Sequence, residues 1–237
     1  MTATIRNSLL TALLALVFGF AGAAAWSYSG LADQRTRDYL LANPEILEDL
    51  FAALQQQQAE GRIAKVADQV YTPFPGAVMG NPQGTRVLVE FTDYNCSYCE
   101  ASLPDITRLI AENPDLKVVL REMPQFDGSE AAARMALAAG MQGKYTEFHD
   151  AMFKVGQANA ESAELVAQQI GIDLVRARSD AASEAVSAEL ARNFSLAQAL
   201  GFNGTPGWIV GDKWVNGYVG YDRMKATLEE AGPPVGE

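Results

Sequence analysis

The chain has 237 residues, a formal net charge of −11 and only two cysteines. Hydrophobic residues make up 49% of it, which is enough for one or two domains with buried cores. The excess of acidic side chains argues against nucleic acid and anionic membrane surfaces as partners, because both would repel them.

Residues 1–25 have the composition of an export signal. Arg6 is their only charged residue, residues 9–20 are apolar, and the alanines at 23–25 resemble a cleavage site for signal peptidase. We therefore predict a cleaved signal peptide. An uncleaved membrane anchor is the alternative, although residues 9–25 are barely long enough to span a bilayer. Either one places the rest of the chain outside the cytosol, and a bacterial periplasm fits best.

Residues 26–70 are expected to form a short helical segment of their own. Asn43-Pro44 is a helix-start signal, because Asn favours the N-cap and Pro fits the first helical position. The apolar residues that follow recur at helical spacing: Ile46, Leu47, Leu50, Phe51 and Leu54. Two interpretations stay open. The stripe either packs on the following domain or forms a seam between the subunits of a homo-oligomer.

Residues 71–237 are expected to form one α/β domain, and the turn-rich stretches 72–76 and 80–84 mark its boundary with the preceding segment. A helical subdomain is expected as an insertion over about residues 124–204. The expected strands are residues 85–92, 116–123, 207–210 and 214–219. The expected helices are residues 96–113, 131–139, 145–155, 163–170, 183–200 and 221–231. Strand, helix and strand, followed by a hairpin and a helix, is the order of a thioredoxin fold.

Cys96 and Cys99 are the most informative residues of the chain. They lie at C-x-x-C spacing after an apolar strand, which places the first sulfur at a helix N-terminus and the second one turn behind it. The helix dipole and unpaired N–H groups stabilise a thiolate there, so the pKa of Cys96 should fall. The pattern predicts a dithiol redox centre.

Three other uses of this spacing fit the sequence less well. A structural zinc site needs four ligands, and His149 is the only histidine beside the two cysteines. A c-type haem site needs a histidine directly after the second cysteine, where this chain has Glu100. A purely structural disulfide across two residues removes little entropy from the unfolded chain.

Thr205-Pro206 is the second candidate part of the site, because it precedes a late strand. It is either an ordinary trans proline in a turn or a cis-proline loop that lies against the cysteines. In the second case the backbone of Thr205 would be free to pair with an extended strand of a client protein.

Three titratable residues have competing interpretations. Glu90, six residues before Cys96, is either a solvated charge or a buried carboxylate that exchanges a proton with Cys99. We expect Asp93 to lie on an exposed turn. We expect His149 to be packed in the helical subdomain rather than to take part in catalysis.

Three stretches carry a family resemblance: residues 91–99 (FTDYNCSYC), 121–124 (REMP) and 204–207 (GTPG). Together they resemble the DsbA-like thioredoxin-fold proteins, and most closely the branch of periplasmic disulfide isomerase-like proteins that includes the copper-sensitivity suppressor ScsC. The likeness extends over about residues 76–231. Residues 41–47 (LANPEIL) also resemble the helical oligomerisation segment of that branch.

The resemblance implies a reactive first cysteine at Cys96, its partner at Cys99 and a cis-proline at Pro206, and Glu90 matches the position of the family's buried acid. The sequence departs from the branch at Ser97, where proline is frequent, and it lacks the histidine that DsbA has between its cysteines. Since Ser and Tyr offer the first sulfur no cation, we expect a less depressed pKa and a milder oxidant than DsbA.

The sequence thus predicts a periplasmic thiol:disulfide oxidoreductase that exchanges disulfides with exported proteins, in the manner of an isomerase or reductase. It would depend on a membrane redox partner that the sequence does not identify, and no cofactor is predicted. Two alternatives stay open. One is a dithiol oxidase of the DsbA type, and the other is a protein that binds clients or Cu(I), which paired thiolates suit.

Overall fold

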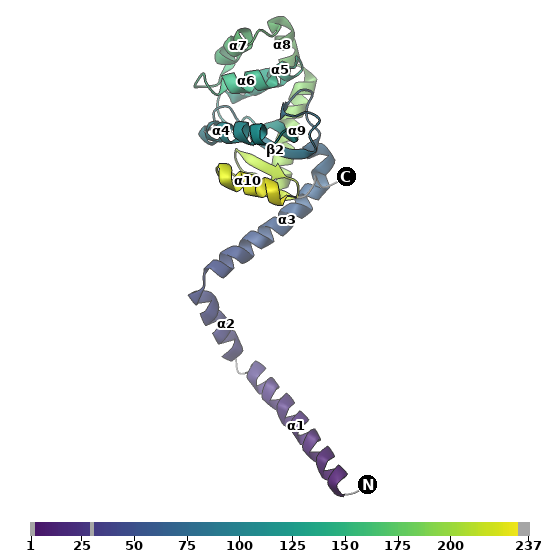
Figure 1. Ribbon diagram of the computed structural model, residues 1–237. Coiled ribbons are helices and arrows are strands. Elements are labelled where there is room, and N and C mark those ends of the chain that lie inside the picture. Colours follow the sequence, from purple (N-terminus) through teal and green to yellow (C-terminus); the bar gives the residue numbers. More distant parts are fainter. Residues whose placement is uncertain (1–2, 29–30, 232–237) are drawn as a thin grey trace. The chain divides into compact units, whose positions relative to one another are not determined.

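The computed structural model describes residues 3–28 and 31–231 (Figure 1). By its internal contacts the chain forms two units, Met1–Gln55 and Gln56–Glu237, which are described separately below. The first unit contains α1 (Ala3–Tyr28), α2 (Leu31–Ala42) and the first part of α3 (Glu45–Tyr71), and the rest of α3 belongs to the second unit.

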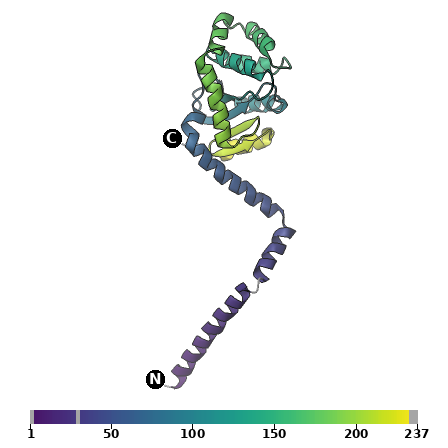
Figure 2. The same ribbon diagram turned by 180° about the vertical axis from the view of Figure 1, so that it is seen from behind.

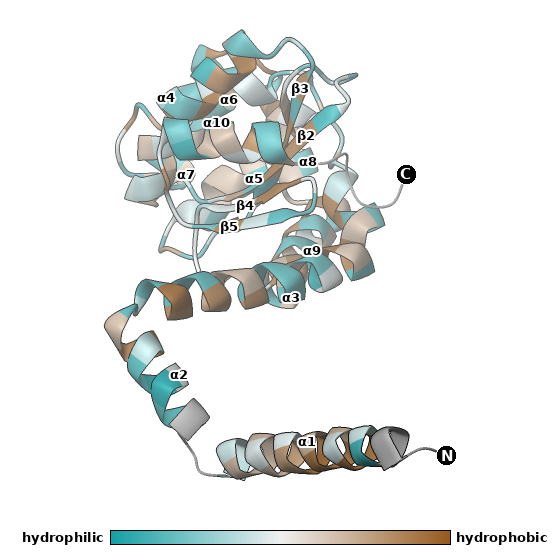
Figure 3. Cartoon of the chain, turned by 60° about the horizontal axis from the view of Figure 1, so that its bottom comes forward, coloured by the Kyte–Doolittle hydropathy of each residue, from teal (hydrophilic) through white to brown (hydrophobic). Residues whose placement is uncertain are grey.

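Helix α1 is apolar along nearly its whole length, as the brown colouring in Figure 3 shows. Its stretch Asn7–Tyr28 has 22 residues, a mean hydropathy of 2.1 and no buried residue. It is therefore long and apolar enough to cross a membrane, a test that a signal sequence also passes.

The expected helix start at Asn43-Pro44 is the junction between α2 and α3. The Asn43 side chain donates to the carbonyl oxygen of Tyr39 at 2.7 Å and so closes the end of α2, while its own carbonyl accepts from Ile46 at 3.1 Å. The apolar stripe that follows on α3 lies in the open, with exposed fractions from 39% to 64% at Leu47, Leu50, Phe51 and Leu54.

The second unit is built on a five-stranded sheet in the order β1-β3-β2-β4-β5. Only β2 and β3 run parallel, and the other neighbours are antiparallel. The strands are β1 (Val78–Gly80), β2 (Arg86–Thr92), β3 (Leu116–Glu122), β4 (Gly207–Val210) and β5 (Lys213–Asn216). The central strands β2 and β3 are almost wholly buried, as expected for a sheet covered on both faces.

Helices cover both faces of this sheet. α4 (Ser97–Glu112) and α10 (Tyr221–Glu230) pack together on one face, while the end of α3 and α9 (Glu184–Leu200) cover the other, which Figure 2 shows from behind. The apolar cluster on that second face contains Ile63, Val70, Val87, Val89, Phe91, Val119, Met123, Leu196, Ala197, Leu200, Phe202 and Ile209.

The remaining helices form the inserted group between β3 and β4. They are α5 (Ser129–Gly140), α6 (Tyr145–Met152), α7 (Ala160–Gln169) and α8 (Leu174–Ala181), which lie together at one end of the unit in Figure 1. Helix α9 follows them in the chain and packs against β3 as well as α5. This is the expected thioredoxin fold with a helical insertion.

A buried arginine ties α3 and α9 to the centre of the sheet. Arg121 of β3 has no exposed surface and donates to the Glu189 carboxylate of α9 at 2.7 Å. Its other terminal nitrogen donates to the carbonyl oxygens of Val70 at 2.9 Å, of Thr72 at 2.5 Å and of Gln69. The last carbonyls of a helix have no partner within it, so Arg121 satisfies the end of α3 and pairs its own charge at once.

The sequence prediction placed most elements correctly and missed some. The strand β1 and the helix α8 were not expected, and β5 ends at Asn216 instead of residue 219. Gly201 does end α9 in the left-handed conformation (φ +84°), as expected of a C-terminal glycine.

Candidate redox site

Cys96 lies at the N-cap of α4, with an extended backbone that turns β2 into the helix (φ −89°, ψ 114°). Its carbonyl oxygen accepts from the N–H groups of Cys99 and Glu100, both at 3.1 Å. Both cysteines are free thiols, with exposed fractions of 5% for Cys96 and 1% for Cys99. Of the two, Cys96 lines a surface hollow of about 440 Å³, so it is the sulfur that an incoming disulfide can reach.

The two sulfurs have opposite acidities. The pKa of Cys96 is lowered to about 5, chiefly by a hydrogen bond from the Cys99 thiol and further by the Thr205 side chain and by N–H groups of the first helical turn, against the effect of burial. The pKa of Cys99 is raised by burial, by the same hydrogen bond and by the charge of Glu90. Cys96 is therefore a thiolate at neutral pH, while Cys99 keeps its proton.

The magnitude of this shift bears on the expectation of a mild oxidant. A pKa of about 5 lies between those of DsbA, about 3.5, and thioredoxin, about 7. No cation lies between the cysteines in the sequence, where Ser97 and Tyr98 stand, so hydrogen bonds take the place of a neighbouring positive charge.

The loop that contains Thr205 and Pro206 lies directly against Cys96. The peptide bond between Thr205 and Pro206 is cis, and the Thr205 carbonyl oxygen is 3.2 Å from Cys96 Sγ, where it accepts the proton of the thiol form. Pro206 is held in turn by the N–H of Gly217 at 2.8 Å. Within the described residues, the backbone N–H groups of residues 203–205 donate no hydrogen bond, so this stretch of backbone is open to pairing.

Glu90 is buried in the middle of the sheet, with 3% of its surface exposed, between Leu120 of β3 and Trp208 of β4. Its pKa is raised well above the usual value, first by burial, then by the charge of Glu122 and, less, by that of Cys96. Of the two sequence interpretations of Glu90, the solvated charge is therefore wrong.

A cluster of buried polar side chains behind the active-site turn was missed by the sequence reasoning. Glu122 Oε1 accepts from the hydroxyls of Tyr94 at 3.0 Å and Tyr145 at 2.5 Å. The Tyr94 oxygen is also 3.0 Å from Nδ1 of His149, which therefore donates to it. The presence of Glu122 among the charged residues of the expected strand 116–123 was the one signal that could have revealed this cluster.

Burial governs the titration of this cluster. It raises the pKa of Glu122 to about 8, against the effect of the two tyrosine hydroxyls, and it lowers the pKa of His149 to about 3. Both groups are therefore neutral in a slightly acidic solution. Glu122 pairs with Thr92, two residues from Glu90, so the two carboxyls lie on the same face of the sheet.

The expectation of an exposed Asp93 was wrong, because only 1% of its surface is accessible. Its carboxylate accepts from the N–H groups of Asn95 at 2.8 Å, Gln125 at 2.5 Å and Phe126 at 3.1 Å, and from the Ser129 hydroxyl at 2.5 Å. Four donors compensate for the loss of water. Asp93 thereby fastens the turn before Cys96 to the segment after β3.

The described residues contain no group of three or more His, Cys, Asp and Glu side chains that could hold a metal ion. The functional groups of the site are the two cysteine sulfurs and the buried acids around them.

Comparisons with known proteins agree with this geometry. A family model described as thioredoxin matches residues 74–230, and a second one, described as the N-terminal domain of the copper resistance protein ScsC, matches residues 34–60. The chain therefore belongs to the thioredoxin family. Within it, the structures below make it a DsbA-like thiol–disulfide oxidoreductase related to ScsC.

Three solved structures illustrate the likeness. A thioredoxin-like oxidoreductase from Silicibacter pomeroyi is 38% identical, with a TM-score of 0.66, and the match covers 69% of this chain and 95% of that one. The thiol-disulfide exchange protein alpha-DsbA2 from Wolbachia pipientis is 26% identical (TM-score 0.68; 75% and 97% covered). The catalytic domain of Proteus mirabilis ScsC is also 26% identical (TM-score 0.64; 72% and 97% covered).

Curated relatives include Na(+)/H(+) antiporters NhaA from Salinispora arenicola, 27% identical over 159 residues, and Herminiimonas arsenicoxydans, 30% identical over 155 residues. The match covers 65% and 64% of this chain, respectively. The chain spans about a quarter of the length of these antiporters, 24% and 25%, so nothing about ion transport follows for it.

We predict that Glu122→Gln flattens the pH dependence of stability. The pKa of Glu122 is about 8 in the folded protein, against about 4.3 in an unfolded chain. Because the folded value is raised, this group's contribution is fully present below about pH 4 and is lost as the pH rises through the folded value. Between about pH 4 and pH 8, the free energy of unfolding of the wild type should therefore fall by on the order of a few kcal/mol relative to that of E122Q.

Urea unfolding of the reduced proteins at a series of pH values measures this difference. Gln at position 122 keeps the oxygen that accepts from Tyr94 and Tyr145, so the packing is preserved. Glu161→Gln, on the exposed start of α7, is the matched control and should follow the wild type. Parallel curves for the wild type and E122Q would contradict the assignment.

Proposed function

We propose that the protein is a periplasmic thiol:disulfide oxidoreductase that acts on exported proteins through Cys96 and Cys99, chiefly in the direction of isomerisation or reduction. The observation that carries the proposal is the opposite acidity of the two sulfurs, which gives one nucleophile at the surface and one protonated thiol behind it. A thiolate is the form that attacks disulfides.

The first step is the attack of the Cys96 thiolate on a client disulfide. A bond forms between Cys96 and one client sulfur, and the client S–S bond breaks. The other client sulfur leaves as a thiolate and takes a proton from solvent. The open N–H groups of residues 203–205 support this step, because an extended client segment can pair with them while its sulfur faces Cys96.

The mixed disulfide can be resolved in two ways. In isomerisation a second client thiolate attacks the client sulfur and releases the Cys96 thiolate. In reduction Cys99 gives its proton to Glu90 and attacks the Cys96 sulfur, which forms the Cys96–Cys99 disulfide and releases the client thiolate with two electrons. The raised pKa of Glu90, which results chiefly from burial, supports its proposed role as the proton acceptor.

The N-terminal helix supports export. Helix α1 is apolar and has no buried residue over Asn7–Tyr28, as a signal sequence or a membrane anchor would have. We propose residues 1–25 as a signal peptide, residues 26–70 as a helical segment and residues 71–237 as the catalytic domain with its insertion over about 124–204. A redox-active dithiol also requires a partner that resets it, which we place in the membrane.

A dithiol oxidase is the second candidate, and the pKa of Cys96 favours it. A pKa well below that of thioredoxin stabilises the reduced form and makes the disulfide form more oxidising. The exposed stripe on α3 favours the isomerase, because subunits joined by it would present several Cys96 thiolates to one client.

We predict that Cys99→Ala accumulates covalent complexes with exported proteins. Without Cys99 the mixed disulfide has lost its intramolecular resolving thiol, so clients stay bound to Cys96. Affinity purification under non-reducing conditions, followed by reduction and mass spectrometry, measures them. Cys99→Ser is a second variant that also lacks the resolving thiol, but its serine hydroxyl can still donate a hydrogen bond to the Cys96 thiolate.

The double variant C96A/C99A is the control and should capture no client. A protein that only binds clients or Cu(I) would form no covalent complexes in C99A, and that result would refute the exchange mechanism. The redox state of Cys96 and Cys99 in intact cells tests the direction of exchange. The wild-type pair should be mostly reduced, as isomerase or reductase action requires, and a mostly oxidised pair would favour the oxidase.

The stripe of α3 predicts a homo-oligomer. Light scattering should give a multiple of the monomer mass for the chain from residue 26 onward, and a monomer once residues 26–55 are removed. The deletion stops there because Ile63 and Val70, further along α3, belong to the core of the catalytic unit. A monomer in both cases would refute the proposed seam.

A further inference from the structure

The hollow that contains Cys96 has an acidic lining. Its volume is about 440 Å³, and it is lined by Tyr94, Asn95, Cys96, Ser97, Glu100, Phe126, Asp127, Gly156 and Gln157. Two of these residues, Glu100 and Asp127, are acidic, and no Lys or Arg is among the described residues that line it. A disulfide that enters this hollow to reach the Cys96 sulfur meets both acidic side chains, so their charge bears on the choice of client.

Three segments of the chain form this hollow, and Asn95 fastens them together. They are the active-site turn with the start of α4, the segment after β3 and the loop after α6. The Asn95 amide nitrogen donates to the carbonyl oxygens of Asp127 and Ala158, both at 2.9 Å, and its amide oxygen accepts from the N–H of Ala158 at 2.7 Å. A Cβ atom at Gly128 would lie 2.5 Å from the Ala158 carbonyl oxygen, so this glycine (φ +87°) allows the two loops to approach. The hollow is therefore held in shape before a client arrives.

Glu100 and Asp127 have no cationic partner in the part of the chain that the structure describes. Both are exposed, and neither side chain there forms an ion pair or accepts a hydrogen bond. Other glutamates at the surface, such as Glu130 and Glu164, are each paired with an arginine. The basic residue closest to the hollow in sequence, Lys154, does not line it. The two acidic side chains are therefore open to a cation from outside.

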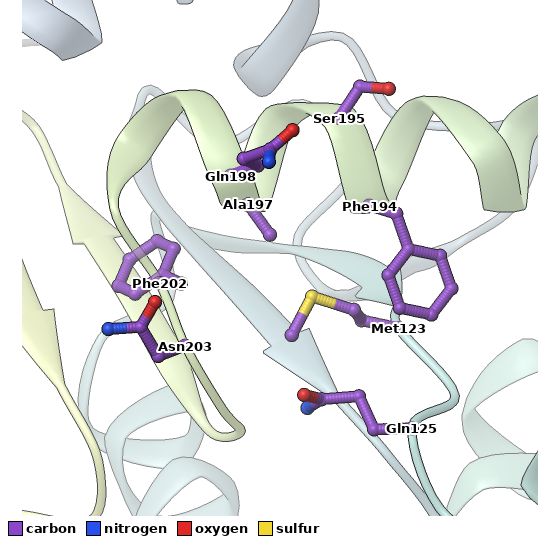
Figure 4. A pocket seen from close by; sticks show the side chains of 8 residues that line it. All are labelled: Met123, Gln125, Phe194, Ser195, Ala197, Gln198, Phe202 and Asn203. Carbon is purple, nitrogen blue, oxygen red and sulfur yellow. The ribbon is translucent and has the colours of Figure 1, made fainter.

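The acidic residues do not line every hollow of this strongly acidic chain. A second hollow, of about 410 Å³, lies between α9 and the end of β3, and Figure 4 shows its lining. None of the residues that line it carries a charge: Met123, Gln125, Phe194, Ser195, Ala197, Gln198, Phe202 and Asn203. The negative charge of the Cys96 hollow is thus a local feature of the redox site.

An acidic pair beside a thiolate is electrostatically unfavourable when it stands alone. The Cys96 thiolate and the two carboxylates have the same sign of charge, and like charges in one site repel each other. A cation that enters with the client interacts favourably with all three. Lys and Arg also have apolar stems, which can lie on the 51% exposed ring of Phe126 while the charged end faces the carboxylates. The lining therefore suits a Lys or Arg side chain better than a neutral or acidic one.

We propose that this hollow selects clients that carry a Lys or Arg close to the disulfide under attack, with Glu100 and Asp127 as the specificity-determining residues. The proposal rests on the exchange function and names its preferred substrates. Glutathione disulfide, in which carboxylates outnumber ammonium groups, is disfavoured by the same two side chains. The hollow thereby favours basic protein segments over this small acidic disulfide.

The test uses blocked peptides with a single cysteine, each joined through a disulfide to the same uncharged pyridine thiol. Both neighbours of the cysteine are Lys, Ser or Glu. The Cys96 thiolate attacks the peptide sulfur, a disulfide between Cys96 and the peptide forms, and the released pyridine thiol is followed by its absorbance. For the reduced wild-type protein at low ionic strength we expect the second-order rate constant to be about tenfold higher with Lys than with Glu, with Ser between them. Added salt should reduce this ratio.

Two variants distinguish the hollow from the charge of the whole protein. Glu100→Gln and Asp127→Asn each remove one negative charge and should each reduce the Lys/Glu rate ratio about threefold. The ratio is unaffected by a change in the acidity of Cys96, because such a change alters the rates of all peptides alike.

Glu229→Gln is the matched control, because it removes the same charge far from the hollow. Glu229 is exposed near the end of α10 and follows Leu228, whose carbonyl oxygen accepts from Arg86 at the start of β2. Cys96 follows the opposite end of β2, roughly 20 Å away along the strand. E229Q should therefore leave the Lys/Glu ratio nearly unchanged.

A Lys/Glu ratio near one in the wild type, or a ratio that falls as far in E229Q as in E100Q and D127N, would overturn the proposed selectivity and leave the exchange function intact. Failure of the reduced wild type to react with any of the peptides or with glutathione disulfide would refute the exchange function itself, and this proposal with it.

Discussion

The site depends on the unequal acidity of two neighbouring sulfurs, those of Cys96 and Cys99. Two neighbouring sulfurs in equal surroundings would share their protons, and neither would be a strong nucleophile near neutral pH. Here the fold makes them unequal. Cys99 is buried inside the first turn of α4, so its charged form is costly, while Cys96 lies at the helix N-terminus with N–H groups around it. The proton stays on the inner sulfur and the charge on the outer one.

The buried acidic side chains deeper in the domain also have unequal surroundings. Asp93 accepts from four donors, which compensate for its burial, and fastens the active-site turn to the segment after β3. Glu122 accepts from two tyrosine hydroxyls, which do not offset its burial, and its pKa is raised to about 8. The pKa of Glu90 is raised as well, first by burial and then by Glu122. Acids whose pKa values are raised by burial therefore lie behind Cys99, the sulfur that must lose and regain a proton.

Local patterns in the sequence were enough to predict the centre of the fold. The apolar run of β2, the cysteine spacing that starts α4 and the proline of the late loop are each visible within a few residues. The strand β1 has three residues, too few for a periodic pattern. The burial of Asp93 and the Glu122 cluster depend on partners 23 to 55 positions away along the chain, such as Tyr145 for Glu122. Such contacts leave no trace in local spacing, so the structure was needed to find them.

The acidity of Cys96 is the property on which nucleophilic attack and the proposed capture of clients depend. The ultraviolet absorbance of the thiolate, followed through a pH titration of the reduced wild-type protein with C96A as the blank, measures it directly. The transition should have its midpoint near pH 5 and shift upward in C99A, which lacks the donating thiol. A midpoint near that of an ordinary free thiol, about 8.5, unchanged by the loss of Cys99, would contradict this description of the site.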